Sequence, residues 1–123
     1  MQVTRHVLLV DDDAELRLAV DRQLAALGCD VIVVENGGDA MRVVAEQLRI
    51  DLLLTELRLP DIDGRELAWA VGQKRPFVRV AFMAKEAPDE PLDPHASFLK
   101  KPFTTTALSQ ALSQARPVRR STR

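Results

Sequence analysis

The amino-acid sequence predicts an α/β fold built on a doubly wound, five-stranded parallel sheet with helices on both faces. Short apolar runs alternate along the chain with segments in which apolar residues recur at helical spacing. The apolar runs do not alternate between polar and apolar residues, which is typical of strands that are buried on both faces. Strands and helices in alternation favour parallel strands joined by crossover helices.

Five apolar runs, each bounded by turn or cap residues, are expected to form the strands. They occupy residues 6–10, 31–34, 52–55, 78–83 and 97–99. Helical spacing of apolar residues predicts four helices, the first after Asp13 and the second from the turn at 36–39 to Leu48; the other two occupy 66–74 and 104–115. Pro88, Pro91 and Pro94 disfavour a helix between the last two strands, so we expect the fourth crossover helix to be shortened or absent.

The size and composition of the chain indicate one domain. Its 123 residues suffice for a single core, which we place in residues 1–115, and we expect the basic segment 116–123 to be a disordered tail. The net charge of -1 predicts no general attraction to nucleic acid or membranes. Cys29 is the single cysteine, which excludes an internal disulfide and suits a reducing compartment. We therefore expect a cytoplasmic protein without a membrane segment.

Charged side chains are expected to meet at one edge of the sheet. In a sheet of order 2-1-3-4-5, the first and third strands are neighbours at the centre. Asp11 and Asp12 leave the first strand, and Glu56 leaves the third. Carboxylates this close require a counter-charge. Lys101, after the fifth strand, is one available cation, and Mg²⁺ bound by Asp11, Asp12 and Glu56 is the other.

A plainer interpretation of the same residues stays open. Asp12 and Asp13 could serve only as caps of the first helix, while Glu56 pairs with Lys101. The chemistry of the residues favours neither interpretation clearly. Asp61 and Asp63 lie in the turn after the third strand and are expected to form local hydrogen bonds.

Three blocks, at residues 7–13, 51–64 and 98–103, resemble the receiver domain of bacterial two-component response regulators. The resemblance covers nearly the whole chain and implies a flavodoxin-like fold. In that family an acidic pair binds Mg²⁺, an aspartate after the third strand accepts phosphate from a histidine kinase, and a lysine contacts the phosphoryl group. The resemblance implies that Asp11 and Asp12 are the acidic pair and that Lys101 is the lysine. It also implies that Phe98 is the aromatic residue that relays the change caused by phosphorylation.

The chain departs from the family pattern at the switch itself. Glu56 stands where the family has its acceptor aspartate, and Ala84 stands where it has serine or threonine. The extra methylene of glutamate moves the carboxylate further into the site, although phosphoryl transfer depends on accurate positioning. Ala84 offers no hydroxyl to a phosphoryl oxygen. Lys85, beside it, is either a second cation near the carboxylates or a solvated loop residue.

These features predict a stand-alone, receiver-like signalling domain of a two-component phosphorelay that is not phosphorylated conventionally and acts through protein contacts. Glu56 either mimics the activated state or belongs to an inert site. The expected partner is a histidine kinase or another two-component protein. A homodimer is left open, and neither a membrane nor nucleic acid is expected as a partner.

Two alternatives remain. The first is a conventional, Mg²⁺-dependent response regulator that is phosphorylated on Glu56 or another acid. The second is a haloacid-dehalogenase-like phosphatase, which a strand followed by Asp11-x-Asp13 resembles, with the first aspartate as nucleophile and the second as general acid. Such enzymes need a further acidic pair after another strand, and none directly follows the fourth predicted strand, where Ala84 and Lys85 stand. We therefore expect no enzymatic activity.

Overall fold

The computed structural model describes residues 4–46 and 49–118. Its centre is a five-stranded sheet of order β2-β1-β3-β4-β5, in which every neighbouring pair of strands is parallel. The strands are β1 (His6–Val10), β2 (Asp30–Val34), β3 (Leu52–Glu56), β4 (Arg79–Ala84) and β5 (Ser97–Lys100). The predicted fold class and strand order are confirmed.

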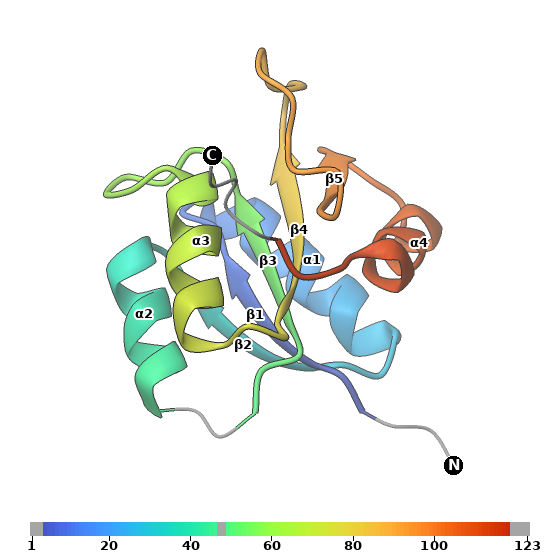
Figure 1. The fold of residues 1–123 in the computed structure, drawn as a ribbon. Helices are drawn as coiled ribbons and strands as arrows, with labels where there is room; N and C mark the ends of the chain where they lie inside the picture. Colours follow the sequence, from blue (N-terminus) through green and yellow to red (C-terminus); the bar gives the residue numbers. More distant parts are fainter. Residues whose placement is uncertain (1–3, 47–48, 119–123) are drawn as a thin grey trace.

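In the described residues, four helices cover the two faces of the sheet (Figure 1). They are α1 (Ala14–Ala26), α2 (Gly37–Glu46), α3 (Gly64–Lys74) and α4 (Thr105–Gln114). Helices α2 and α3 pack on one face, and α1 and α4 pack on the other. None of the helices in the described ranges combines the length and the apolar character needed to cross a bilayer.

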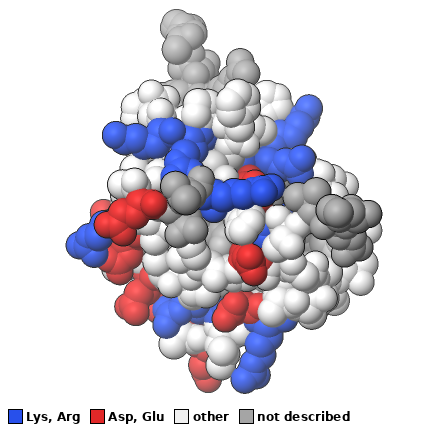
Figure 2. Space-filling model, turned by 90° about the horizontal axis from the view of Figure 1, so that it is seen from below, with Lys and Arg blue, Asp and Glu red and all other residues white. Residues whose placement is uncertain are grey.

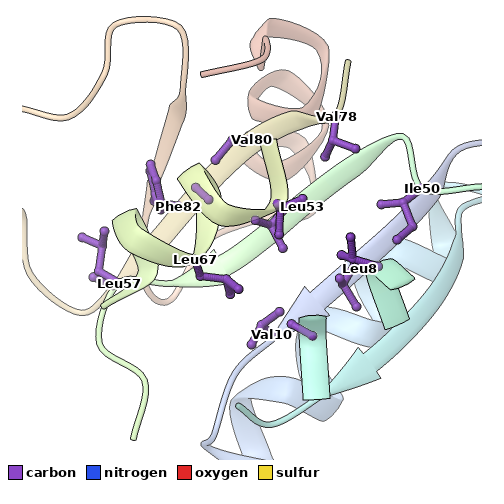
Figure 3. Packing of buried hydrophobic residues seen from close by; sticks show 14 residues of the cluster. Leu8, Val10, Ile50, Leu53, Leu57, Leu67, Val78, Val80 and Phe82 are labelled. Atoms are coloured by element: carbon purple, nitrogen blue, oxygen red, sulfur yellow. The ribbon is translucent and has the colours of Figure 1, made fainter. Parts of the chain in front are cut away.

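The strands contribute to both layers of the core because successive side chains point to opposite faces of a sheet. In β1, Leu8 and Val10 belong to the layer under α2 and α3, whereas Val7 and Leu9 belong to the layer under α1 and α4. Figure 3 shows the first of these layers, in which Leu8 and Val10 lie beside Leu53 of β3. Burial on both faces explains why the strands are unbroken apolar runs.

Polar caps determine where the helices begin. Asp13 caps α1, Asp63 caps α3 and Thr104 caps α4, each by accepting hydrogen bonds from backbone N–H groups of the first turn. Helix α2 begins at Gly37, within the predicted turn at 36–39, and its first N–H is bonded by Asp61. Helix α3 begins at Gly64, two residues earlier than predicted, because the side chain of Asp63 caps the N–H of Arg65. Leu48, expected in the second helix, lies outside the described residues.

A loop, and not a helix, joins β4 to β5. Residues 85–96 contain no helix, as the prolines predict, and in Figure 1 this segment projects beyond the carboxyl ends of the strands. The face of the sheet beside β4 is consequently left without its own crossover helix.

The chain after α4 returns to that face. The backbone N–H of Val80 donates to the carbonyl oxygen of Arg116 at 3.2 Å, and the N–H of Arg116 donates to the carbonyl oxygen of His95 at 2.9 Å. Val118 packs against the core layer under α2 and α3. The predicted disorder from residue 116 is therefore wrong for residues 116–118, because these backbone bonds attach them to the domain. Residues 119–123 lie outside the described part of the chain.

Candidate functional site

Three charged side chains meet where the central strands end. Asp11 directly follows β1, Glu56 is the last residue of β3, and Lys101 directly follows β5. The carboxyl ends of parallel strands share one edge of the sheet, so the topology itself brings these residues together. The backbone N–H of Lys101 also donates to the carbonyl oxygen of Ala84 at 2.8 Å, which fixes the start of the loop that carries the lysine.

The ammonium group of Lys101 bridges the two carboxylates, and these three residues are hereafter called the ion triad. Lys101 Nζ lies 2.6 Å from Asp11 Oδ2 and 2.5 Å from Glu56 Oε1. The side chains of Asp11, Lys101 and Glu56 are 0%, 2% and 13% exposed. Charge-assisted hydrogen bonds of this length are strong where water is excluded. The predicted pairing of Glu56 with Lys101 is present, and Asp11 shares the same cation.

Backbone donors occupy the remaining carboxylate oxygens of the ion triad. Asp11 Oδ1 accepts from the N–H of Asp13 at 3.0 Å. Glu56 Oε2 accepts from the N–H of Leu57, also at 3.0 Å. Each carboxylate oxygen of the triad therefore has a protein donor, and the orientation of both acids is set by the fold.

The triad determines the protonation of Lys101. Burial by itself would lower the pKa of Lys101, but hydrogen bonds and charge interactions with Asp11 and Glu56 outweigh it and raise the pKa above the ordinary 10.5. The lysine therefore carries its positive charge at neutral pH and neutralises part of the charge of the two acids.

The acidic residues do not assemble the expected magnesium set. Asp12 is exposed, and Asp13 uses its carboxylate as the cap of α1, with Oδ1 3.1 Å from the N–H of Glu15. No three His, Cys, Asp or Glu side chains in the described ranges are grouped so that they could hold a metal ion. The Lys101 ammonium group already contacts one oxygen of Asp11 and one oxygen of Glu56, so a Mg²⁺ bound by both acids would compete with it for the same pair of carboxylates. As placed, Asp11 and Glu56 have a protein counter-charge in Lys101.

Thr55, the residue before Glu56, does not supply the hydroxyl that Ala84 lacks. Ala84 ends β4 next to the triad and is buried. Thr55 is fully buried, and its hydroxyl donates to the backbone carbonyl of Glu56 at 3.0 Å. The hydroxyl of Thr55 is thus engaged with the main chain and does not face the Glu56 carboxylate oxygens.

Beside Glu56 the surface is hollowed by about 670 Å³ between the loop after β3 and the loop after β4. Arg65 and Glu90 form an ion pair of 3.2 Å at its wall. Lys85 is exposed at this hollow and forms no ion pair within the described residues. Its placement favours the solvated loop residue over a second cation in the triad.

Phe98 lies opposite Phe82 in the pairing of β4 with β5. It is partly buried and packs against the core layer that contains Phe82 and Ala84. The aromatic ring that the family resemblance assigns to the relay is therefore held in the core face beside the loop that replaces the fourth crossover helix.

Asp61 bonds to residues far from it in the sequence, whereas the sequence predicted only local hydrogen bonds for it. Its Oδ1 accepts from the N–H of Gly37 at 2.9 Å, and its Oδ2 accepts from the N–H of Gly38 at 2.8 Å. The bond to Gly37, followed by the bond to Gly38, lowers the pKa of Asp61 below 3.8. Asp61 thus caps α2 from the loop after β3. Two adjacent glycines at a helix start, with free N–H groups and no side chains, were the only signal for it in the sequence.

Comparison with known proteins identifies the family. Residues 7–113 match the response regulator receiver domain family, a range that includes all three residues of the ion triad. The chain belongs to this family.

Two relatives illustrate the range of proteins that contain such a domain. The transcriptional regulatory protein GlrR of Escherichia coli (strain K12) is 31% identical over 115 residues, which are 89% of this chain and 26% of GlrR. The chain therefore spans only 26% of the length of that relative. The response regulator receiver protein CpdR of Brucella abortus (strain 2308) is 31% identical over 104 residues, which are 80% of this chain and 86% of CpdR.

Solved structures agree with the fold. A response regulator receiver protein from Sinorhizobium medicae WSM419 superposes with a TM-score of 0.80 at 28% identity, covering 90% of this chain and 93% of that one. The receiver domain of the hybrid histidine kinase CckA gives a TM-score of 0.76 at 26% identity, covering 89% of this chain and 96% of that one.

Proposed function

We propose that this receiver domain signals through protein contacts in a two-component pathway without being phosphorylated in the usual way. The observation that carries the proposal is the bond between Glu56 Oε1 and Lys101 Nζ, by which a glutamate at the acceptor position closes the ion triad. Receiver domains are signalling domains, and this one is proposed to signal without a phosphorylation switch.

The position of the Glu56 carboxylate argues against phosphoryl transfer to it. In-line transfer requires a nucleophilic oxygen placed accurately in front of the donor phosphorus, and a shift of about 1 Å can cost about 100-fold in rate. A glutamate carries its oxygens one methylene beyond those of an aspartate. Both oxygens of Glu56 are also engaged, one by Lys101 and one by the N–H of Leu57.

The surroundings of Glu56 support the same conclusion. Ala84 offers no hydroxyl to a phosphoryl oxygen. Lys101 supplies the counter-charge for Asp11 and Glu56 that a Mg²⁺ would otherwise supply. We infer that Lys101 permanently balances part of the negative charge of Asp11 and Glu56. Mg²⁺ therefore binds Asp11, Asp12 and Glu56 weakly at most.

The proposed partners are a histidine kinase or another two-component protein in the cytoplasm. The loop at 85–96 and the segment at 116–118 replace the surface that a fourth crossover helix would present. A partner that binds there meets a loop and the C-terminal segment in place of a helix. The same surface is where a homodimer would form if the domain self-associates.

Conventional phosphorylation is the second candidate function, because Asp11, Lys101 and Phe98 retain the family pattern around Glu56. A phosphatase of the haloacid-dehalogenase type has less support. Asp13, its expected general acid, is engaged as the cap of α1, and Asp11, its expected nucleophile, is bonded to Lys101.

Incubation with acetyl phosphate and Mg²⁺, followed by intact-protein mass spectrometry, distinguishes these functions. The proposal predicts no phosphate adduct on the wild type and an adduct on Glu56→Asp combined with Ala84→Thr. The same double variant with Lys101→Met serves as the control that lacks the phosphate-contacting lysine. A stable adduct on wild-type Glu56 would overturn the proposal in favour of conventional phosphorylation.

A further inference from the structure

Positively charged residues gather at the edge of the sheet opposite the ion triad. Arg5 precedes β1, Arg49 precedes β3 and Arg79 begins β4, while Lys74 and Arg75 end α3. The amino ends of parallel strands share one edge, so residues distant in sequence meet there. Figure 2 looks onto this edge and shows Lys and Arg side chains across its middle.

These cations surround a hollow of about 560 Å³. Asp51 is the one acidic residue among the described residues that line it, and its carboxylate is already engaged by the N–H of His6 at 2.8 Å and by Arg49 at 3.3 Å. None of the ion pairs among the described residues involves Arg5, Lys74 or Arg79. The hollow is therefore strongly positive, although the chain as a whole has a net charge of -1.

An exposed aromatic ring lies at the same hollow. Phe77 is 89% exposed, the highest value among the large hydrophobic side chains of the described residues. Isolated exposed apolar residues are common on proteins, but this one stands between Lys74 and Arg79 at the rim of a basic hollow. Arginine and aromatic side chains together are the residues that most often dominate the binding energy of protein interfaces.

We propose that this edge, defined by Arg5, Lys74, Phe77 and Arg79, is a docking surface for an acidic segment of a partner protein. Carboxylates of the segment pair with the guanidinium groups, which bind them in a bidentate manner, and an apolar side chain of the segment covers Phe77. Nucleic acid is the less suitable occupant, because single-stranded nucleic acid needs successive aromatic rings for stacking and this hollow offers one.

The surface is independent of the proposed switch. The ion triad lies at the carboxyl ends of the strands and the basic hollow lies at their amino ends, so a variant at one edge leaves the other intact. Failure of the docking proposal and failure of the proposed function are therefore distinguishable.

Titration of the full chain with a fluorescein-labelled peptide of eight glutamates and two leucines, read by anisotropy and amide NMR, tests the proposal. We expect saturable binding that weakens with salt, with amide shifts around Phe77 and Arg79. Arg79→Glu with Lys74→Glu is expected to weaken binding at least tenfold, and Phe77→Ser several-fold. These side chains are largely exposed, so folding should survive.

Matched variants on another face are the controls. Arg22→Glu and Leu18→Ser change an exposed cation and an exposed apolar side chain of α1, and both are expected to bind the peptide as the wild type does. A loss of binding in Arg22→Glu equal to that in Arg79→Glu with Lys74→Glu would overturn the proposal, as would no binding at all. Tighter binding of an oligothymidylate than of the peptide would overturn it in favour of a nucleic-acid surface.

Discussion

At the scale of single residues, the proposed loss of phosphorylation rests first on the extra methylene of Glu56. This methylene extends the carboxylate toward Lys101 Nζ, which also bonds Asp11, so one buried cation serves two acids. A buried charge that loses its partner is costly, because the remaining charges stay in a medium that solvates them poorly. The ion triad therefore ties the function of the site to the stability of the domain.

Replacing Lys101 by methionine tests how much the ion triad contributes to the stability of the domain. The variant leaves Asp11 and Glu56 facing each other without a cation, and we expect a loss of about 3 kcal/mol in the free energy of unfolding. Urea denaturation measures the loss. Adding Glu56→Gln to the variant should restore part of it, because one of the two repelling charges is removed. A loss below about 1 kcal/mol in Lys101→Met would mean that the triad resembles an exposed ion pair.

The raised pKa of Lys101 gives the same triad a signature in alkali. The folded-state pKa lies above the unfolded value of 10.5, so its contribution to stability is complete below pH 10.5 and is lost as the pH rises through the folded-state value. The stability advantage of the wild type over Lys101→Met should therefore shrink in this alkaline range. The chain has no tyrosine, so tyrosine titration does not obscure the comparison. An advantage that stays constant through the range would contradict this assignment.

Asp61, in the loop after β3, holds the first two residues of α2. Its pKa is lowered by the N–H groups of Gly37 and Gly38, so its contribution to stability is present above pH 3.8 and is lost as the pH falls through the folded-state value. We expect Asp61→Ala to lower the melting temperature at neutral pH and to speed amide exchange at both glycines. Asp89→Ala, in the exposed loop after β4, is the control and should change neither. Unchanged exchange at Gly37 and Gly38 would rule out the cap.

At the scale of the elements, the C-terminal segment compensates for the absent crossover helix. Arg116 bonds Val80 of β4 and His95 before β5, and Val118 packs beside Phe82. A segment without a helix thus covers part of a sheet face that would otherwise be exposed.

Val118→Asp is expected to destabilise the domain by about 1–2 kcal/mol, because it places a charge against an apolar layer. Trp69, the one tryptophan of the chain, lines the same groove as Val118, so its fluorescence should shift to longer wavelength in the variant. Val118→Leu keeps the apolar contact and should leave the emission unchanged. If the emission of Val118→Asp matches that of the wild type, Val118 does not shield this face in solution.

The sequence predicted the elements whose signals are local. The apolar runs at β1 and β3, the cap at Asp13 and the prolines after β4 each indicate their structure within a few residues. It did not predict contacts between distant segments that carry no periodic pattern. The cap that Asp61 provides to α2 and the bonds of Arg116 to β4 depend on tertiary placement, which composition and spacing do not encode.

The candidate site was predictable for a different reason. Parallel topology alone sends Asp11, Glu56 and Lys101 to one edge of the sheet, so their meeting follows from strand order. Which cation neutralises the acids did not follow, because Lys101 and Mg²⁺ satisfy the same charge requirement. The reach of the lysine side chain, with both bonds formed at once, favours Lys101.

At the scale of the whole molecule, the two edges of the sheet differ in charge and in role. The carboxyl edge holds a closed ion triad, and the amino edge holds an open basic hollow beside Phe77. A net charge of -1 conceals this separation. The domain is thus expected to bind partners constitutively, by surfaces that no phosphoryl group needs to rearrange.

The most direct test of the central claim is an amide NMR titration with Mg²⁺ and beryllofluoride, which mimics a phosphoryl group. We expect no shifts at Asp11, Glu56 and Lys101 in the wild type, and clear shifts there in Glu56→Asp combined with Ala84→Thr. Shifts at these residues in the wild type would contradict the account, because the site would still accept the mimic. An absence of response in the double variant would contradict it as well, since the loss is attributed to these two positions.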